Sequence, residues 1–116
     1  MEICFEGVGQ AVATFLTEAE LTAGQAVALT GSSTVGLGES GALPCGVTVG
    51  AERNGAVAVQ IAGAVTVGYS GGTAPTVGYC ALTCDGKGML AKAEDSGLTC
   101  LVLAVDETAR TVTVKL

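Results

Sequence analysis

The stretch AVAVQIAGAVTVGY, residues 56–69, decides the fold class of this 116-residue chain. Side chains two residues apart lie on the same face of a β-strand. The larger apolar residues of the stretch all stand at odd positions: Val57, Val59, Ile61, Val65, Val67 and Tyr69. This alternation predicts one long strand with a continuous apolar face. Gly63 shares the odd parity and is expected to let the strand bend or bulge.

Shorter runs with the same period flank this stretch on both sides. Asn54-Gly55 immediately precedes it, and this dipeptide is typical of a tight turn between two strands. The last run, Val112 to Leu116, is expected to be an edge or near-edge strand. The other predicted strands are centred on residues 11–16, 27–29, 35–37, 47–49, 79–83, 89–92 and 101–105.

Short strands at this spacing predict an all-β protein, an antiparallel β-barrel or sandwich of about eight to ten strands. We expect a single β-domain over residues 1–116, with at most one or two helical turns. Thr17-Glu18-Ala19-Glu20 fits either one such turn, by its capping pattern, or a polar turn. The sequence shows no internal repeat.

Composition indicates what kind of core, partner and cellular location to expect. Hydrophobic residues make up 49% of the chain but aromatic residues only 3%, which predicts a thin Ala/Val core and stability drawn partly from subunit contacts. The net charge is −6 and the five basic residues are scattered, so we expect no nucleic acid partner. Neither a membrane span nor a signal peptide is visible. Synthesis in the cytoplasm, with reduced cysteines, is therefore expected.

Candidate chemistry is sparse. Cys80 and Cys84 form a lone C-x3-C pair, which fits either part of a metal site or two small buried thiols; the second is favoured because no histidine accompanies them. The absence of histidine also excludes a serine–histidine hydrolase. Paired carboxylates fall in predicted turns. We expect no catalytic, cofactor-binding or metal-binding residues, and we expect that the protein is not an enzyme.

Three segments carry a family resemblance. They are LTAGQAVALTGSSTVGLGESG (residues 21–41), PCGVTVGAERNGAVAVQIAGAVTVGYSG (residues 44–71) and LVLAVDETARTVTVKL (residues 101–116). In their glycine–valine phrases and their terminal hairpin, they resemble the small capsid decoration proteins of tailed bacteriophages and prophages. The resemblance covers about three quarters of the chain. The short, acidic N-terminus and the five cysteines depart from that pattern.

The resemblance implies a homotrimer that binds the major capsid protein and stabilises an assembled head. The protein would be in the host cytoplasm during assembly and then on the surface of the virion head. Residues 1–10 would be the capsid-binding arm, with Met1, Glu2, Ile3, Cys4 and Phe5 as its contact residues. The second candidate is a rim loop of Ser70, Gly71, Gly72, Thr73, Ala74 and Pro75. Alternatives are a phage tail or baseplate β-module and a small cysteine-based metal-binding module.

Overall fold

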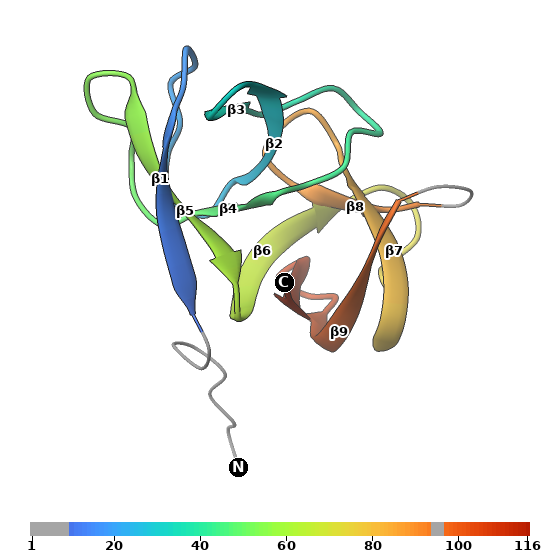
Figure 1. Ribbon diagram of the computed structural model, residues 1–116. Helices are drawn as coiled ribbons and strands as arrows, with labels where there is room; N and C mark the ends of the chain where they lie inside the picture. Colours follow the sequence, from blue (N-terminus) through green and yellow to red (C-terminus); the bar gives the residue numbers. More distant parts are fainter. Residues whose placement is uncertain (1–9, 94–96) are drawn as a thin grey trace.

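The computed structural model describes residues 10–93 and 97–116, and within them the chain forms ten strands and no helix (Figure 1). The strands form two sheets of five, and each sheet closes into a small barrel. The predicted all-β class is confirmed. The N-terminal barrel consists of β1 (Ala11–Leu16), β2 (Ala26–Gly31), β3 (Thr34–Gly36), β4 (Gly46–Thr48) and β5 (Ala56–Ala62). The C-terminal barrel consists of β6 (Ala64–Ser70), β7 (Gly78–Cys84), β8 (Leu90–Lys92), β9 (Leu98–Asp106) and β10 (Thr111–Lys115).

The two barrels have the same topology. Around the N-terminal barrel the order is β1-β3-β2-β4-β5, and around the C-terminal barrel it is β6-β8-β7-β9-β10. In each barrel the first strand pairs in parallel with the third, and all other neighbours are antiparallel. The chain thus has a repeat in its topology that the sequence does not show. Strand pairing, rather than residue identity, carries the repeat.

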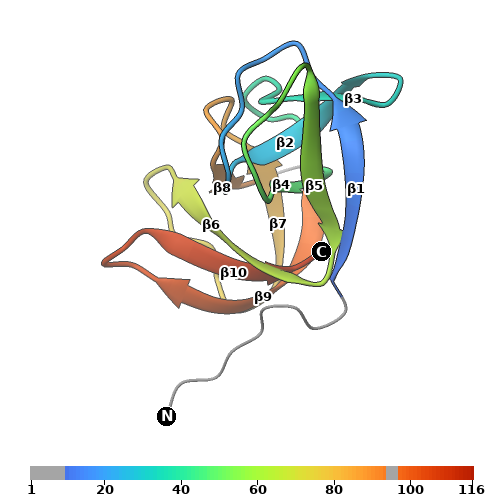
Figure 2. The same ribbon diagram turned by 90° about the vertical axis from the view of Figure 1, so that its left-hand side faces the viewer.

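The stretch 56–69 is two strands, not one. Gly63 has a φ of 89°, a conformation that favours glycine, and it separates β5 from β6. The predicted apolar face is interrupted before Gly63, because Ile61 is 41% exposed whereas Gln60 is buried. The parts on either side enter different cores: Val59 packs in the N-terminal barrel and Val67 in the C-terminal one. Figure 2 shows β5 and β6 diverging from this corner. The predicted single long strand is thus corrected to a junction between barrels.

Each barrel encloses an apolar core in which valine is the commonest residue. The N-terminal core contains Leu21, Val27, Val35, Val57 and Val59. The C-terminal core contains Val67, Tyr69, Cys80, Leu82, Leu90, Cys100, Val102, Val112 and Val114, together with Ala26 and Val47 from the N-terminal barrel. Those last two residues show that the barrels share a packed boundary.

Backbone hydrogen bonds reinforce that boundary. The amide of Ala26 donates to the carbonyl of Gly88 at 2.8 Å. Cys84 is bonded on both sides, because its amide donates to Ala42 at 2.8 Å and its carbonyl accepts from Gly41 at 2.9 Å. The side chain of Gln60 adds a buried bond from its Nε2 to the carbonyl oxygen of Ala64 at 3.0 Å. The boundary is therefore ordered by polar contacts as well as by packing.

Several local predictions can now be compared with the structure. Asn54 (φ 52°) and Gly55 (φ 78°) form the predicted tight turn. Residues 17–20 form no helix; the Thr17 hydroxyl accepts a hydrogen bond from the Ala19 amide at 3.1 Å, so the polar turn is correct. β10 is not an edge strand, because barrel closure pairs it with both β6 and β9. No helix long and apolar enough to cross a membrane occurs in the described residues.

Candidate functional site: the rim loop

The rim loop, residues 70–75, connects β6 to β7 and projects from the C-terminal barrel. Its tip, Gly71 to Thr73, is exposed, whereas Pro75 is buried and Ala74 packs against the barrel core. Apart from the adjacent residues, no described residue has an atom within 4 Å of the position that a Cβ would occupy at Gly71 or at Gly72. The loop therefore presents a narrow, accessible tip on an anchored base.

One anchor is a carboxylate. The Ser70 hydroxyl donates to Asp85 Oδ2 at 2.7 Å, and Asp85 Oδ1 accepts from the amides of Lys87 (2.7 Å) and Met89 (3.0 Å). Burial acts to raise the pKa of Asp85, but these hydrogen bonds and the nearby Lys87 charge outweigh it, so the pKa lies below its usual value. Ionised Asp85 thus ties the start of the rim loop to the loop between β7 and β8.

The second anchor is Arg110, in the turn between β9 and β10. Its Nη2 donates to the carbonyl of Gly71 at 2.9 Å, and its guanidinium carbon lies 5.1 Å from the centroid of the Tyr69 ring. This distance is that of a cation–π contact. The backbone also joins the two segments, because the Tyr69 amide donates to the Arg110 carbonyl at 3.0 Å. The rim loop is consequently held by two neighbouring turns.

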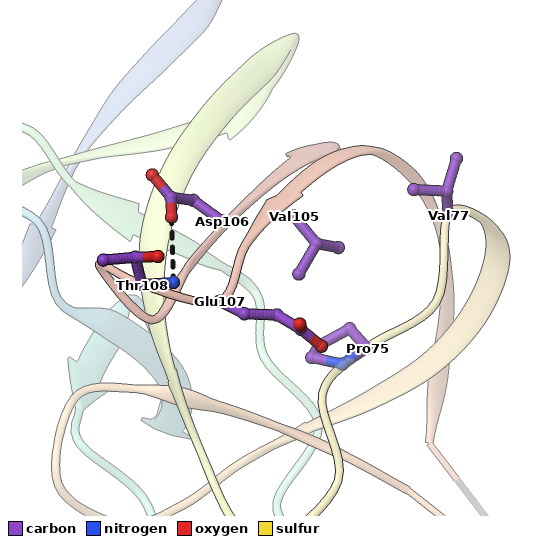
Figure 3. A pocket seen from close by; sticks show the side chains of 6 residues that line it. All are labelled: Pro75, Val77, Val105, Asp106, Glu107 and Thr108. Carbon is purple, nitrogen blue, oxygen red and sulfur yellow. Dashed lines mark hydrogen bonds between the residues drawn. The ribbon is translucent and has the colours of Figure 1, made fainter.

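Hollows flank the rim loop on both sides. One, of about 420 Å³, is lined by residues 70–73 and by residues 91–93 at the end of β8. The other, of about 540 Å³, is lined by Pro75, Val77 and residues 105–108 (Figure 3). Both hollows are open, and their linings contain small, hydroxyl and aliphatic side chains, with Lys92 in the smaller hollow and the Asp106–Glu107 pair in the larger one. Such linings suit contact with another macromolecule better than the enclosure of a small molecule.

A structured turn forms the wall of the larger hollow. Asp106 Oδ1 accepts hydrogen bonds from the amides of Thr108 (3.0 Å) and Ala109 (3.1 Å). The dashed line in Figure 3 marks the first of these bonds. The carboxylate of Asp106 therefore shapes the turn, as Asp often does at such positions. Val77 is an apolar side chain of this hollow that is 69% exposed, and it was not expected as a site residue.

The cysteines have separate neighbours. Cys80 and Cys84 are both buried on β7, but Cys80 lies directly opposite Cys100 on β9. Burial raises the pKa of Cys84 to about 11, with further contributions from Cys45 and Asp85. The described residues include no group of three His, Cys, Asp or Glu side chains that could hold a metal ion. Cys80, Cys84 and Cys100 are buried thiols, and Cys45 is partly buried.

The predicted site residues meet different outcomes. The arm residues Met1, Glu2, Ile3, Cys4 and Phe5 lie outside the described residues. The rim loop is exposed at its tip as a Gly-rich loop should be, although Pro75 is buried. Sequence reasoning missed both anchors of the loop. Asp85 and Arg110 are 15 and 39 residues from their loop partners, so no local pattern could reveal the contacts.

Comparison with known proteins identifies a structural neighbour. No protein family model and no curated protein sequence matches the chain. Among solved structures, the chain is similar to the head fiber gp8.5 N base in bacteriophage phi29, with a TM-score of 0.64 and 19% sequence identity. The alignment covers 92% of this chain and 93% of that one. At this identity the likeness concerns the fold, so this chain has the fold of a phage head fiber base.

Proposed function

We propose that this chain is a structural virion protein that binds an assembled phage head from outside and stabilises it as a decoration protein. The observation that carries the proposal is the fold shared with a phage head protein over nearly the full length of both chains. The sequence resemblance to capsid decoration proteins supports the same class independently of the fold. In this role the chain is a homotrimer, its partner is the major capsid protein, and it catalyses no reaction.

The rim loop is the described segment best suited to attachment. Its exposed tip has almost no side-chain bulk, so its backbone is available to a partner, while the anchors at Asp85 and Arg110 limit the entropy lost on binding. The arm, residues 1–10, is the other attachment element proposed from the sequence. Three copies of either element in one oligomer multiply a weak contact, by about 10² to 10⁴ in affinity.

Co-sedimentation with heads tests this function. Purified protein is mixed with heads, lacking the native copy of this chain, from the phage that encodes it. The proposal predicts that the protein pellets with the heads and saturates at a fixed ratio to the major capsid protein, and that decorated heads withstand more heat or chelator. Absence of binding at micromolar concentration would refute the decoration role.

Two variants then separate the attachment elements. Deletion of residues 1–10 tests the arm, and Gly72→Lys tests the rim loop. Gly72 has open space around it and no positive φ, so the added side chain fits the fold. Gly50→Lys is the matched control, because Gly50 is equally open and lies in the N-terminal barrel half of the chain. Selective loss of head binding in one variant identifies the element; full binding by both would exclude both.

A further inference from the structure

A row of side chains that crosses three strands forms part of the contact between the two barrels. Ala26 on β2 lies opposite Val47 on β4, and Val47 lies opposite Gln60 on β5. Residues directly opposite in an antiparallel pair share a face of the sheet. All three are at most 4% exposed, and Ala26 and Val47 belong to the core of the C-terminal barrel. Through this buried row, the N-terminal barrel packs against the C-terminal barrel.

The same topology gives the C-terminal barrel an equivalent row. Val57 and Val59 on β5 correspond to Val112 and Val114 on β10, because both pairs point into their own barrels at the same distance after a residue of positive φ, Gly55 or Arg110. With these positions matched, Gln60 on β5 corresponds to Lys115 on β10. The strand pairings then give the residues that correspond to Val47 and Ala26. Tyr79 on β7 lies opposite Leu101 on β9, and Leu101 lies opposite Lys115 on β10, so these three are the exposed row.

The two rows differ in burial and in size. Tyr79 is 78% exposed, the highest value among the large hydrophobic side chains described, Leu101 is half-buried and Lys115 is exposed. An aromatic ring beside an aliphatic side chain, with a charge at the border, is typical of the centre of a protein interface. We propose that the exposed row binds a second copy of this chain, in the manner in which the buried row binds the C-terminal barrel.

The receiving surface follows from the same equivalence. Within the chain, the buried row meets the C-terminal barrel at Gly88, just before β8. The corresponding place in the N-terminal barrel is the segment 32–34, just before β3. Two exposed leucines flank it: Leu16 (58%), whose amide donates to the Ser33 carbonyl at 2.8 Å, and Leu29 (59%). The N-terminal barrel thus has two exposed leucines beside the segment that corresponds to Gly88.

The second copy is preferred over another partner because this contact would repeat, between two chains, the contact that the two barrels make within one chain. Each chain then has one exposed row and one receiving surface, at different barrels. Such a contact is head-to-tail, and it forms a closed ring when the rotation between neighbours permits. The inference rests on the oligomer in the proposed function, and it specifies which faces build that oligomer. It makes no use of the rim loop, which stays free for the head.

Sedimentation velocity on two face variants and their mixture tests the inference. Tyr79→Asp disables the exposed row, and Leu16→Asp disables the receiving surface; if the latter does not fold, Leu29→Asp replaces it. Each variant alone is expected to be monomeric, with self-association weakened at least about tenfold. An equimolar mixture is expected to form a dimer and nothing larger, since only one intact row meets one intact receiving surface.

Other outcomes overturn the inference in distinguishable ways. Leu43→Asp is the control, because Leu43 is also 58% exposed but belongs to neither face, and its oligomer should match the wild type. If the Tyr79→Asp variant keeps the wild-type size, or if the mixture stays monomeric, the proposed faces are wrong, but the proposal of an oligomer stands. If the wild-type chain is monomeric, both the proposed faces and the proposed oligomer are wrong. The decoration role would still be decided by head binding, which is measured separately.

Discussion

Ala26 and Tyr79 stand at equivalent positions of the two barrels, yet Ala26 is 0% exposed and Tyr79 is 78% exposed. Ala26 is covered because the second barrel of the same chain packs against it. Nothing within the described residues covers Tyr79 in the same way. The shared topology therefore gives the chain two equivalent faces. The face at Ala26 is used within the chain, and the face at Tyr79 is available for another molecule.

Close packing at Gly46 makes a sharp prediction about stability. A Cβ on Gly46 would lie 2.6 Å from Val59 Cγ1 and would clash with the backbone carbonyl oxygen of Gln60. Gly46→Ala is expected to lower the free energy of unfolding by about 1 to 3 kcal/mol, the usual effect of overpacking. Gly50→Ala is the control, because its surroundings are open. Urea denaturation measures both, and equal midpoints for the two variants would contradict the packing described here.

Asp85 predicts how stability changes with pH. Its pKa is depressed in the folded state, so its contribution is present above the unfolded pKa and is lost as pH falls through the lower folded value. Wild-type protein should therefore lose stability below a pH near the ordinary Asp value of 3.8 more steeply than Asp85→Asn. At neutral pH, Asp85→Ala should be less stable by about 1 to 3 kcal/mol, since three hydrogen bonds are lost. Parallel acid profiles for wild type and Asp85→Asn would contradict this role.

The buried cysteines should react slowly. Burial raises the pKa values of Cys45 and Cys100, and raises that of Cys84 to about 11, so few thiolates exist near neutral pH. In a Cys4→Ser background, a chromogenic disulfide reagent at about pH 8 should label the folded chain far more slowly than the chain in denaturant. Stability should also fall as pH rises from 9.0 toward 11, because the unfolded thiol of Cys84 ionises first. Labelling of the folded and unfolded chains at the same rate would contradict the burial of these thiols.

Cooperativity tests whether the two barrels fold as the single domain expected from the sequence. Ala26 and Val47 belong to the C-terminal core, so the N-terminal barrel should not unfold without disturbing its neighbour. We predict one transition in urea, with far-UV circular dichroism and tyrosine fluorescence coinciding. Tyr69 reports on the C-terminal barrel alone. A dichroism change that precedes the fluorescence change would indicate two separate units.

Local patterns predicted the strands well. The run Ala11–Leu16 and the turn at Asn54-Gly55 appear where expected, because alternation and turn chemistry depend on neighbouring residues. Closure of two barrels was not predictable in this way. Gly63 fitted a bend in one strand as well as a junction between two barrels, and only pairing between distant strands distinguishes them. Leu29 shows the same limit: it has the same parity as the buried Val27, but it is 59% exposed.

The candidate site was only half visible in the sequence. Glycine, serine and proline in residues 70–75 predict an exposed loop, and its tip is exposed. The anchors at Asp85 and Arg110 come from other turns and depend on the folded barrel. The exposed row is also invisible locally, because Tyr79 reads as an ordinary strand residue until its counterpart, Ala26, is known. Only the pairing of distant strands reveals the loop anchors and the exposed row.

Imaging of decorated heads by electron cryomicroscopy tests the central claim most directly. Heads of the encoding phage that lack this chain are imaged before and after addition of the purified protein. The decoration role predicts new density of two-barrel size, repeated on the outer surface at equivalent positions of the capsid lattice. Heads that look identical before and after addition, or density confined to a tail or portal vertex, would contradict it.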